Sequence, residues 1–277
     1  MSVIDKVVVD MLVEQIRNIE GLLKSDVISY YGAIDERIEN VFFNTIESLA
    51  ESNCQTLTII LTTNGGSAET VERMVKVIRH HYDTVNFIIP DCAYSAGTIF
   101  CMSGDNIFMD YKSVLGPIDP QVKNRDGRWV PALGYLDKIN ELLGKALDNT
   151  ISHPEFLLLK EFDLAELRAY EQARDLAVSL LTTWLTRYKF KTWNVSQETK
   201  EIRAKEIASE LGNNSRWLSH GRPIDMAQLR ELRLEINDYG ENLELRSAIR
   251  NYYSLFADYI FKYQISFLIQ TREVFIA

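Results

Sequence analysis

Apolar positions recur every three to four residues between Val3 and Leu23, and charged residues fill the positions between them. This period places the apolar side chains along one face of a helix. We therefore predict that residues 1–24 form an N-terminal amphipathic helix. A second helical pattern follows, in which Ile38, Phe42 and Ile46 share a face.

Short β-prone runs alternate with these helical patterns. Residues 26–32 and 56–62 are rich in β-branched and apolar side chains, and the second run is continuous, as is typical of a strand buried on both faces of a parallel sheet. A turn at Asn64–Ser67 leads into a helical pattern that ends near Tyr82, and residues 85–89 form another strand-like run. This alternation predicts an α/β fold with right-handed crossovers.

After one more strand-like run, the character of the chain changes beyond about residue 135. Residues 106–115 are strand-like and end at the sequence GPIDPQ, whose prolines and glycine favour a rigid loop. Helical periods then dominate, over residues 163–184, over 196–211 and along the aromatic C-terminal segment. We expect an α/β core over residues 25–150 and a helical region over 151–277 that contributes to the active site and to assembly.

Composition narrows the function classes. The chain has 277 residues, 46% of them hydrophobic and 25% charged, with a formal net charge of -9. A binder of nucleic acid or of an anionic membrane usually needs a basic face, so neither partner is expected. Asp5, Asp10, Glu14 and Arg17 interrupt the apolar runs of the first helix, which argues against a signal peptide or a membrane span. A cytoplasmic location is the expectation.

The three cysteines, Cys54, Cys92 and Cys101, are odd in number and lack the spacing of metal ligands. Each lies in an apolar segment, which predicts three buried free thiols. No cluster of histidine, cysteine and aspartate has the spacing of a metal site, so no metal or cofactor is implied.

Two turns carry candidate chemistry. Gly65 and Gly66 separate a buried strand from a helix, where missing side chains let a substrate carbonyl approach main-chain N–H groups. Ser95 lies among Ala93, Ala96 and Gly97, small residues that allow a tight turn into a helix and expose the hydroxyl. Taken alone, Ser95 is equally well explained as a helix N-cap.

The two turns together resemble a known superfamily. TIILTTNGGSAETV followed by IIPDCAYSAGTIFCMSGD is similar to the ClpP/crotonase superfamily, in which a glycine pair and a helix-opening serine form the site. GPIDPQ and RWLSHGRPIDMAQLRELRLEI further resemble the serine dehydrogenase proteinase family, over roughly residues 25–236. The fold that this resemblance implies is a ClpP/crotonase-like core of repeated ββα units with a helical C-terminal extension.

The resemblance also implies a function and site residues. It implies a serine peptidase acting on peptide or protein substrates, with Ser95 as nucleophile, Asp119 as orienting carboxylate and His220 as general base. By similarity to ClpP, the N–H groups of Gly66 and Ala96 would form the oxyanion hole. Relatives of this fold generally assemble into rings or trimers, so a homo-oligomer is expected by analogy.

Other residues are candidates for the base. His153 is the main rival among the histidines, whereas His80 and His81 end a helix, where a cation near the C-terminal carbonyls is useful structurally. In a Ser-Lys dyad, as in the signal peptide peptidase relatives, Lys138 is the candidate and would have to be desolvated to act as a base.

Three further function classes stay open. A crotonase-type acyl-CoA enzyme would use the same paired N–H groups but usually employs glutamates, and no suitable Glu pair lies near the site. An α/β-hydrolase esterase is an alternative because the sequence from Ala93 to Gly97 is one residue from the G-x-S-x-G elbow. The third class is an inactive scaffold with a ClpP-like fold.

Overall fold

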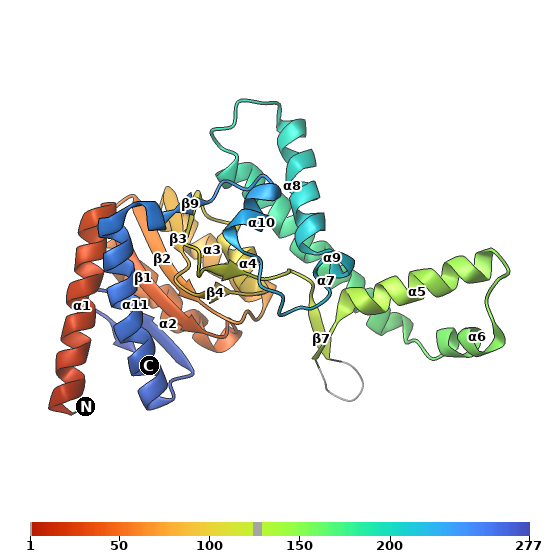
Figure 1. Cartoon of the computed structure of the whole chain (residues 1–277), viewed down its shortest axis with the longest axis horizontal. Coiled ribbons are helices and arrows are strands. Elements are labelled where there is room, and N and C mark those ends of the chain that lie inside the picture. The colour runs from red at the N-terminus through yellow and green to blue at the C-terminus, as the bar shows by residue number, and fades with distance from the viewer. Residues whose placement is uncertain (1, 124–128) are drawn as a thin grey trace.

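The computed structural model describes residues 2–123 and 129–277, and its centre is a seven-stranded sheet (Figure 1). Along the described residues the elements follow in this order: α1 (Val3–Leu23), β1 (Asp26–Gly32), η1 (Glu36–Ile38), α2 (Glu39–Ala50), β2 (Thr56–Thr62), α3 (Ala68–His81), β3 (Thr84–Ile88), β4 (Cys92–Ala93), α4 (Ala96–Cys101), β5 (Asn106–Met109), β6 (Val114–Leu115), β7 (Gln121–Lys123), β8 (Trp129–Pro131), α5 (Ala132–Leu147), α6 (His153–Lys160), α7 (Leu164–Trp184), η2 (Leu185–Lys189), α8 (Gln197–Leu211), α9 (Asn214–Trp217), α10 (Met226–Glu231), β9 (Asn237–Asp238), η3 (Tyr239–Glu241), α11 (Leu243–Tyr263), β10 (Phe267–Gln270) and β11 (Phe275–Ile276).

The main sheet is mostly parallel. Its strand order is β11-β10-β1-β2-β3-β5-β9, in which β1, β2, β3, β5 and β9 run parallel and β10 and β11 are antiparallel to their neighbours. In the centre of the sheet, Ile59 of β2 lies between Ile28 of β1 and Phe87 of β3. The strand predicted over residues 56–62 is therefore confirmed as a central strand.

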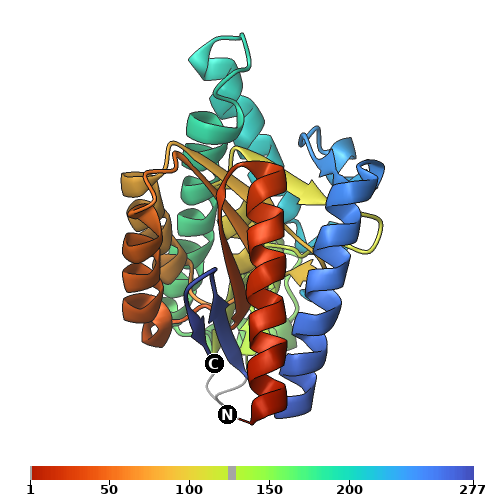
Figure 2. The same cartoon turned by 90° about the vertical axis from the view of Figure 1, so that its left-hand side faces the viewer.

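Helices cover both faces of this sheet. Ile59 packs into the cluster formed with α2, α3, α4, α7 and α8, whereas Ile60 packs with α1 and α11 on the other face. Figure 2 shows α1 in red and α11 in blue side by side in front of the strands. Because successive side chains of a strand point to opposite faces, a strand covered on both sides needs an unbroken apolar run.

Short strands follow two of the main strands and form a second, smaller layer. β4 pairs in parallel with β6, and Thr63 at the end of β2 forms a parallel bridge with Ala93 of β4. A main strand, a short strand and a helix therefore follow one another in β3, β4 and α4. This is the repeated ββα arrangement, and the predicted fold class is confirmed.

The C-terminal half is mainly helical, as predicted, but it also returns to the sheet. β9 pairs with β5, and β10 pairs with β1 from the other end of the chain. These short strands were not predicted, because the sequence around them was interpreted as helical. The strand predicted over residues 106–115 is also wrong in extent, because it is divided into β5 and β6 by a turn in which Ser113 N–H donates to the Asp110 carbonyl.

Helices α5 and α6 extend away from the sheet as an arm (Figure 1). Ala132 and Leu136 of α5 pack with Tyr170 of α7 in a small cluster at the base of this arm. Among the described residues, no helix is both long and apolar enough to cross a membrane.

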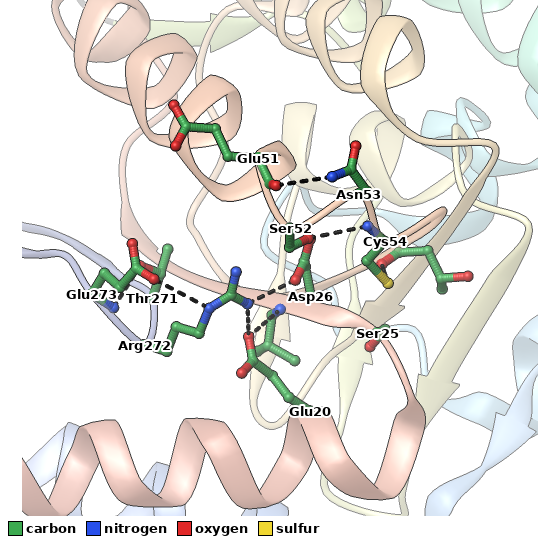
Figure 3. A network of polar contacts seen from close by, with 12 residues as sticks. Glu20, Ser25, Asp26, Glu51, Ser52, Asn53, Cys54, Thr271, Arg272 and Glu273 are labelled. Atoms are coloured by element: carbon green, nitrogen blue, oxygen red, sulfur yellow. Dashed lines mark hydrogen bonds and ion pairs between the residues drawn. The ribbon is translucent and has the colours of Figure 1, made fainter.

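A charged network ties the two ends of the chain together (Figure 3). Nη1 of Arg272 lies 2.8 Å from Oε1 of Glu20 and 2.7 Å from Oδ1 of Asp26. Asp26 also accepts hydrogen bonds from the hydroxyls of Ser52 and Tyr82. Although burial opposes the charge, the bonds to Asp26 and Glu20 raise the pKa of Arg272. The network holds the segment after β10 against the start of β1.

Replacing this arginine is expected to destabilise the fold. Arg272→Met leaves two poorly exposed carboxylates without their cation, and we expect the free energy of unfolding to fall by about 3 kcal/mol. Urea denaturation measures this change. Arg168→Met is the matched control, since Arg168 is 64% exposed beside Glu171 and its loss should cost less than about 0.5 kcal/mol. Equal losses in the two variants would contradict a stabilising role for the network.

Candidate active site

The glycine turn after β2 fits into a space that admits no side chain. The Ile34 N–H donates to the Gly65 carbonyl, and the Ser67 N–H donates to the Ile34 carbonyl. A Cβ atom on Gly66 would lie 2.7 Å from the carbonyl carbon of Ile34 and 2.9 Å from its nitrogen. Gly66 also has φ of +151°, which side-chain-bearing residues rarely adopt. Glycine is therefore required here for two separate reasons.

Ser95 begins helix α4 in a strained conformation. Its φ is 53° and its ψ is -117°, and its side chain makes no capping hydrogen bond to the helix. Non-glycine residues are costly in this region and cluster at functional sites. Ser95 occupies the N-cap position of α4, but among the described residues its hydroxyl has no hydrogen-bond partner, so capping does not explain its side chain.

Small residues allow the two turns to meet. A Cβ atom on Gly65 would lie 2.7 Å from Cβ of Ser95 and 2.8 Å from the carbonyl oxygen of Tyr94. A Cβ atom on Gly97 would overlap the methyl group of Thr63. This role of Gly65 could not be predicted from the sequence, where only its position next to Gly66 signals it.

Two main-chain amides lie free beside Ser95. Within the described part of the chain, the N–H groups of Gly66 and Ala96 donate no main-chain hydrogen bond. Ala96 is the first residue of α4, so its amide has no partner within the helix. These are the two donors that the sequence analysis expected at an oxyanion hole.

The loop that carries Asp119 is fixed to the serine turn. The hydroxyl of Thr98 lies 2.8 Å from the carbonyl oxygens of both Ala93 and Gly116, and it accepts a hydrogen bond from the Gly116 N–H at 3.0 Å. The Ile118 N–H donates to the Leu211 carbonyl. The role of Thr98 was also not predicted. Nothing in the sequence of a short apolar helix indicates that its threonine joins two loops by hydrogen bonds.

The loop that carries His220 is held against the Asp119 loop by main-chain bonds. Leu115 and Ile224 exchange N–H to carbonyl hydrogen bonds of 3.0 and 2.9 Å. His220 and Asp119 are 101 residues apart in sequence, yet Nδ1 of His220 lies 2.7 Å from Oδ1 of Asp119. The Asp119 side chain is 2% exposed and that of His220 is 23% exposed.

This hydrogen bond orients the imidazole. A carboxylate oxygen accepts hydrogen bonds, so Nδ1 of His220 is the donor to Asp119, and Nε2 is the ring nitrogen that remains for a second partner. Oδ2 of Asp119 is buried and has no hydrogen-bond partner among the described residues. The pairing therefore rests on a single charge-assisted bond.

A cleft of about 710 Å³ brings the predicted residues together. Gly65, Gly66, Ser95, Ala96 and His220 all line it, and Asp119 lies behind His220. The apolar side chains that line the cleft include Ile99, Ile118, Leu176 and Ala177. Helix α7 contributes the last two of these residues, which sequence analysis had assigned only to a long helix.

The alternative bases lie elsewhere. Lys138 does not line the cleft and is exposed beside Glu141, with Nζ 3.0 and 2.9 Å from the two carboxylate oxygens. His153 is exposed at the start of α6, on the projecting arm. His80 and His81 lie at the C-terminal end of α3, as predicted. None of these four residues lines the cleft that contains Ser95.

The prediction of three buried thiols is wrong for two of them. All three cysteines are free, but Cys54 and Cys92 are half-buried and only Cys101, inside α4, is buried. Cys54 and Cys92 lie next to turns at strand ends. At such positions an apolar neighbouring sequence does not ensure that the thiol is buried. Within the described ranges, no group of three metal-ligating side chains occurs.

A protein-family model matches most of the chain. The family model described as ClpP-like SDH-type serine proteinase matches residues 39–243, which include both turns and both loops. Two uncharacterized proteins of Methanocaldococcus jannaschii are each 28% identical to the chain, over 179 and 180 residues, or 65% of this chain in both cases. The aligned parts make up 51% and 52% of those proteins, so the chain spans about half the length of the curated relatives it matches.

Among solved structures, ClpP1 from Listeria monocytogenes is similar over 79% of this chain and 93% of its own, with 13% identity and a TM-score of 0.42. A membrane-bound stomatin-specific protease is similar over 65% of this chain and 82% of its own, with 17% identity and a TM-score of 0.34.

The glycine turn generates a stability prediction. In Gly66→Ala, the new Cβ must displace the Ile34 main chain, and we expect the free energy of unfolding to fall by about 2–4 kcal/mol. Gly144→Ala is the control, since within the described residues nothing lies within 4 Å of a Cβ there and its helix should gain up to about 1 kcal/mol. Chemical denaturation of both variants measures the difference. A Gly66→Ala protein as stable as the unmodified one would show that the turn tolerates a side chain.

Proposed function

Because the chain belongs to the ClpP-like SDH-type serine proteinase family, we propose that it is a serine peptidase in which Ser95 is the nucleophile, His220 the general base and Asp119 the carboxylate that orients His220. The N–H groups of Gly66 and Ala96 form the oxyanion hole in this proposal. The family match supports the reaction class, and the geometry of the cleft supports the assignment of roles.

One observation carries the proposal more than any other. A strained serine without a capping bond lines the same cleft as a histidine whose Nδ1 is bonded to a buried aspartate. Strain of this kind persists only where the surrounding structure enforces it. Here Gly65, Gly97 and Thr63 enforce it by their close packing around the turn.

The proposed chemistry proceeds in two halves. Nε2 of His220 takes the proton from Ser95 Oγ, and Oγ attacks the substrate carbonyl carbon, whose oxygen becomes an anion that accepts hydrogen bonds from Gly66 and Ala96. The imidazolium then gives its proton to the amine, the C–N bond breaks and an acyl-enzyme remains. His220 then deprotonates a water molecule, whose oxygen attacks the ester carbon. The bond from the acyl carbon to Oγ breaks, the acid leaves, and the imidazolium returns its proton to Oγ, which restores both Ser95 and His220.

Asp119 supports both proton transfers. Its bond to Nδ1 keeps the imidazole in the tautomer that leaves Nε2 free, and its charge stabilises the imidazolium that forms after each transfer. Because the Asp119 side chain is 2% exposed, this interaction is little screened by solvent.

A Ser-Lys dyad needs a desolvated lysine next to the serine. Lys138 is 53% exposed and paired with Glu141, so it lacks that environment. Burial lowers the pKa of another lysine, Lys189, to about 8, but Lys189 is bonded to the Asp105 carbonyl and does not line the cleft. Both facts favour His220 as the base. The ClpP-like family assignment disfavours the esterase alternative, which needs an α/β-hydrolase fold.

Peptide hydrolysis tests this assignment of roles. With fluorescein-labelled casein as substrate, Ser95→Ala and His220→Ala should each lower kcat by about 10^4-fold or more, since triad members act as a unit. Lys138→Ala should stay within about twofold of the unmodified enzyme, because it removes only an exposed ion pair. If Lys138→Ala is inactive while His220→Ala is active, the proposed base is wrong.

A further inference from the structure

A second groove meets the cleft at the ends of β1 and β2. This groove has a volume of about 660 Å³ and lies between the strand ends and the last turns of α11. Ala33 and Asn64 line both the groove and the cleft. The two hollows are therefore adjacent, with the cleft on the α7 side of the sheet and the groove on the α11 side.

The surface of the groove suits an extended chain with large apolar side chains. Tyr31, Tyr253, Ile260, Phe261 and Ile265 line it. Phe261 is 79% exposed, although it belongs to a helix whose other large apolar residues are mostly covered. Exposed aromatic groups that rim a concave surface are typical of binding sites.

Asn64 lies at the junction and is free to bind a main chain. It is exposed, and its carboxamide has no hydrogen-bond partner among the described residues. A carboxamide both donates and accepts hydrogen bonds, so it matches the N–H and carbonyl groups of a peptide that passes over it.

The carboxylates that line the two hollows face no lysine or arginine of the same lining among the described residues. Asp91 lines the groove, and Glu69 and Asp35 line the cleft, where Asp35 is paired with Arg37 outside the lining. Asp91 is exposed and lies 3.2 Å from the hydroxyl of Tyr253. Burial, reinforced by the charge of Asp91, raises the pKa of the neighbouring Cys92 thiol to about 12. The groove therefore favours cationic side chains and disfavours anionic ones.

We propose that this groove is an extended subsite for polypeptide substrate, which binds residues distant from the scissile bond and selects segments that combine large apolar side chains with a lysine or arginine near Asp91. The proposal rests on the peptidase function proposed for the cleft. Continuity through Ala33 and Asn64 identifies the occupant as the same chain that reaches Ser95.

Binding to an inactive protein tests the subsite without catalysis. In the Ser95→Ala background, fluorescence anisotropy compares a long labelled peptide with a truncated one that keeps only the residues next to the scissile bond. Phe261→Ser should weaken binding of the long peptide about tenfold and leave the truncated peptide unchanged. Leu243→Ser is the matched control on the same helix, 69% exposed and outside the groove, and should change neither affinity.

A second pair of peptides tests charge selection. Each distal position of the long peptide is occupied in turn by Lys or by Glu. At the position that faces Asp91, the Lys peptide should bind about fivefold or more tightly than the Glu peptide, and Asp91→Asn should remove this difference. The subsite is overturned if Phe261→Ser and Leu243→Ser behave alike, or if long and truncated peptides bind equally. If the peptides bind as expected but Ser95→Ala still cleaves casein, Ser95 is not the nucleophile, whereas the groove is still a peptide-binding subsite.

Discussion

The space around Gly65 and Gly66 is the constraint on which the rest of the site depends. Any side chain on Gly66 would collide with the main chain of Ile34, and any side chain on Gly65 would collide with Ser95. The end of β2, the loop after β1 and the start of α4 are therefore in direct contact. Gly66, Ala96 and Ser95 line one cleft, and among the described residues the amides of Gly66 and Ala96 donate no main-chain hydrogen bond. The close approach also holds Ser95 at a positive φ that non-glycine residues rarely adopt.

The second element of the site comes from far along the chain. The main-chain bonds between Leu115 and Ile224 join two loops, and the bond between Asp119 and His220 follows from that docking. The C-terminal region also returns to the sheet through β9 and β10, and Arg272 fixes its last segment to Asp26. The same region supplies α11, whose last turns form the wall of the proposed subsite. Segments from both halves of the chain thus meet at the sheet and at the cleft.

Local patterns predicted what depends on local sequence. Strand β2 was predicted from its unbroken apolar run and helix α1 from its helical period. Both elements are confirmed, with bounds close to those expected. β10 was missed because a four-residue strand carries too little pattern to separate it from the helix before it, and its partner β1 lies at the other end of the chain. Asp119 and His220 were predicted from a family resemblance, because the sequence around each residue does not indicate that the two side chains pair. The cross-link through Thr98 and the contact of Gly65 with Ser95 depend on three-dimensional packing, so only the structure reveals them.

The activation of Ser95 that we propose for the Asp119–His220 pair is tested most directly by the rate of labelling by a fluorophosphonate probe. We expect one covalent adduct, located on Ser95 by peptide mapping, which forms at the same rate in the unmodified protein and in Lys138→Ala and at least about a hundredfold more slowly in His220→Ala. Labelling of another residue, or labelling of Ser95 in His220→Ala at the unmodified rate, would contradict it.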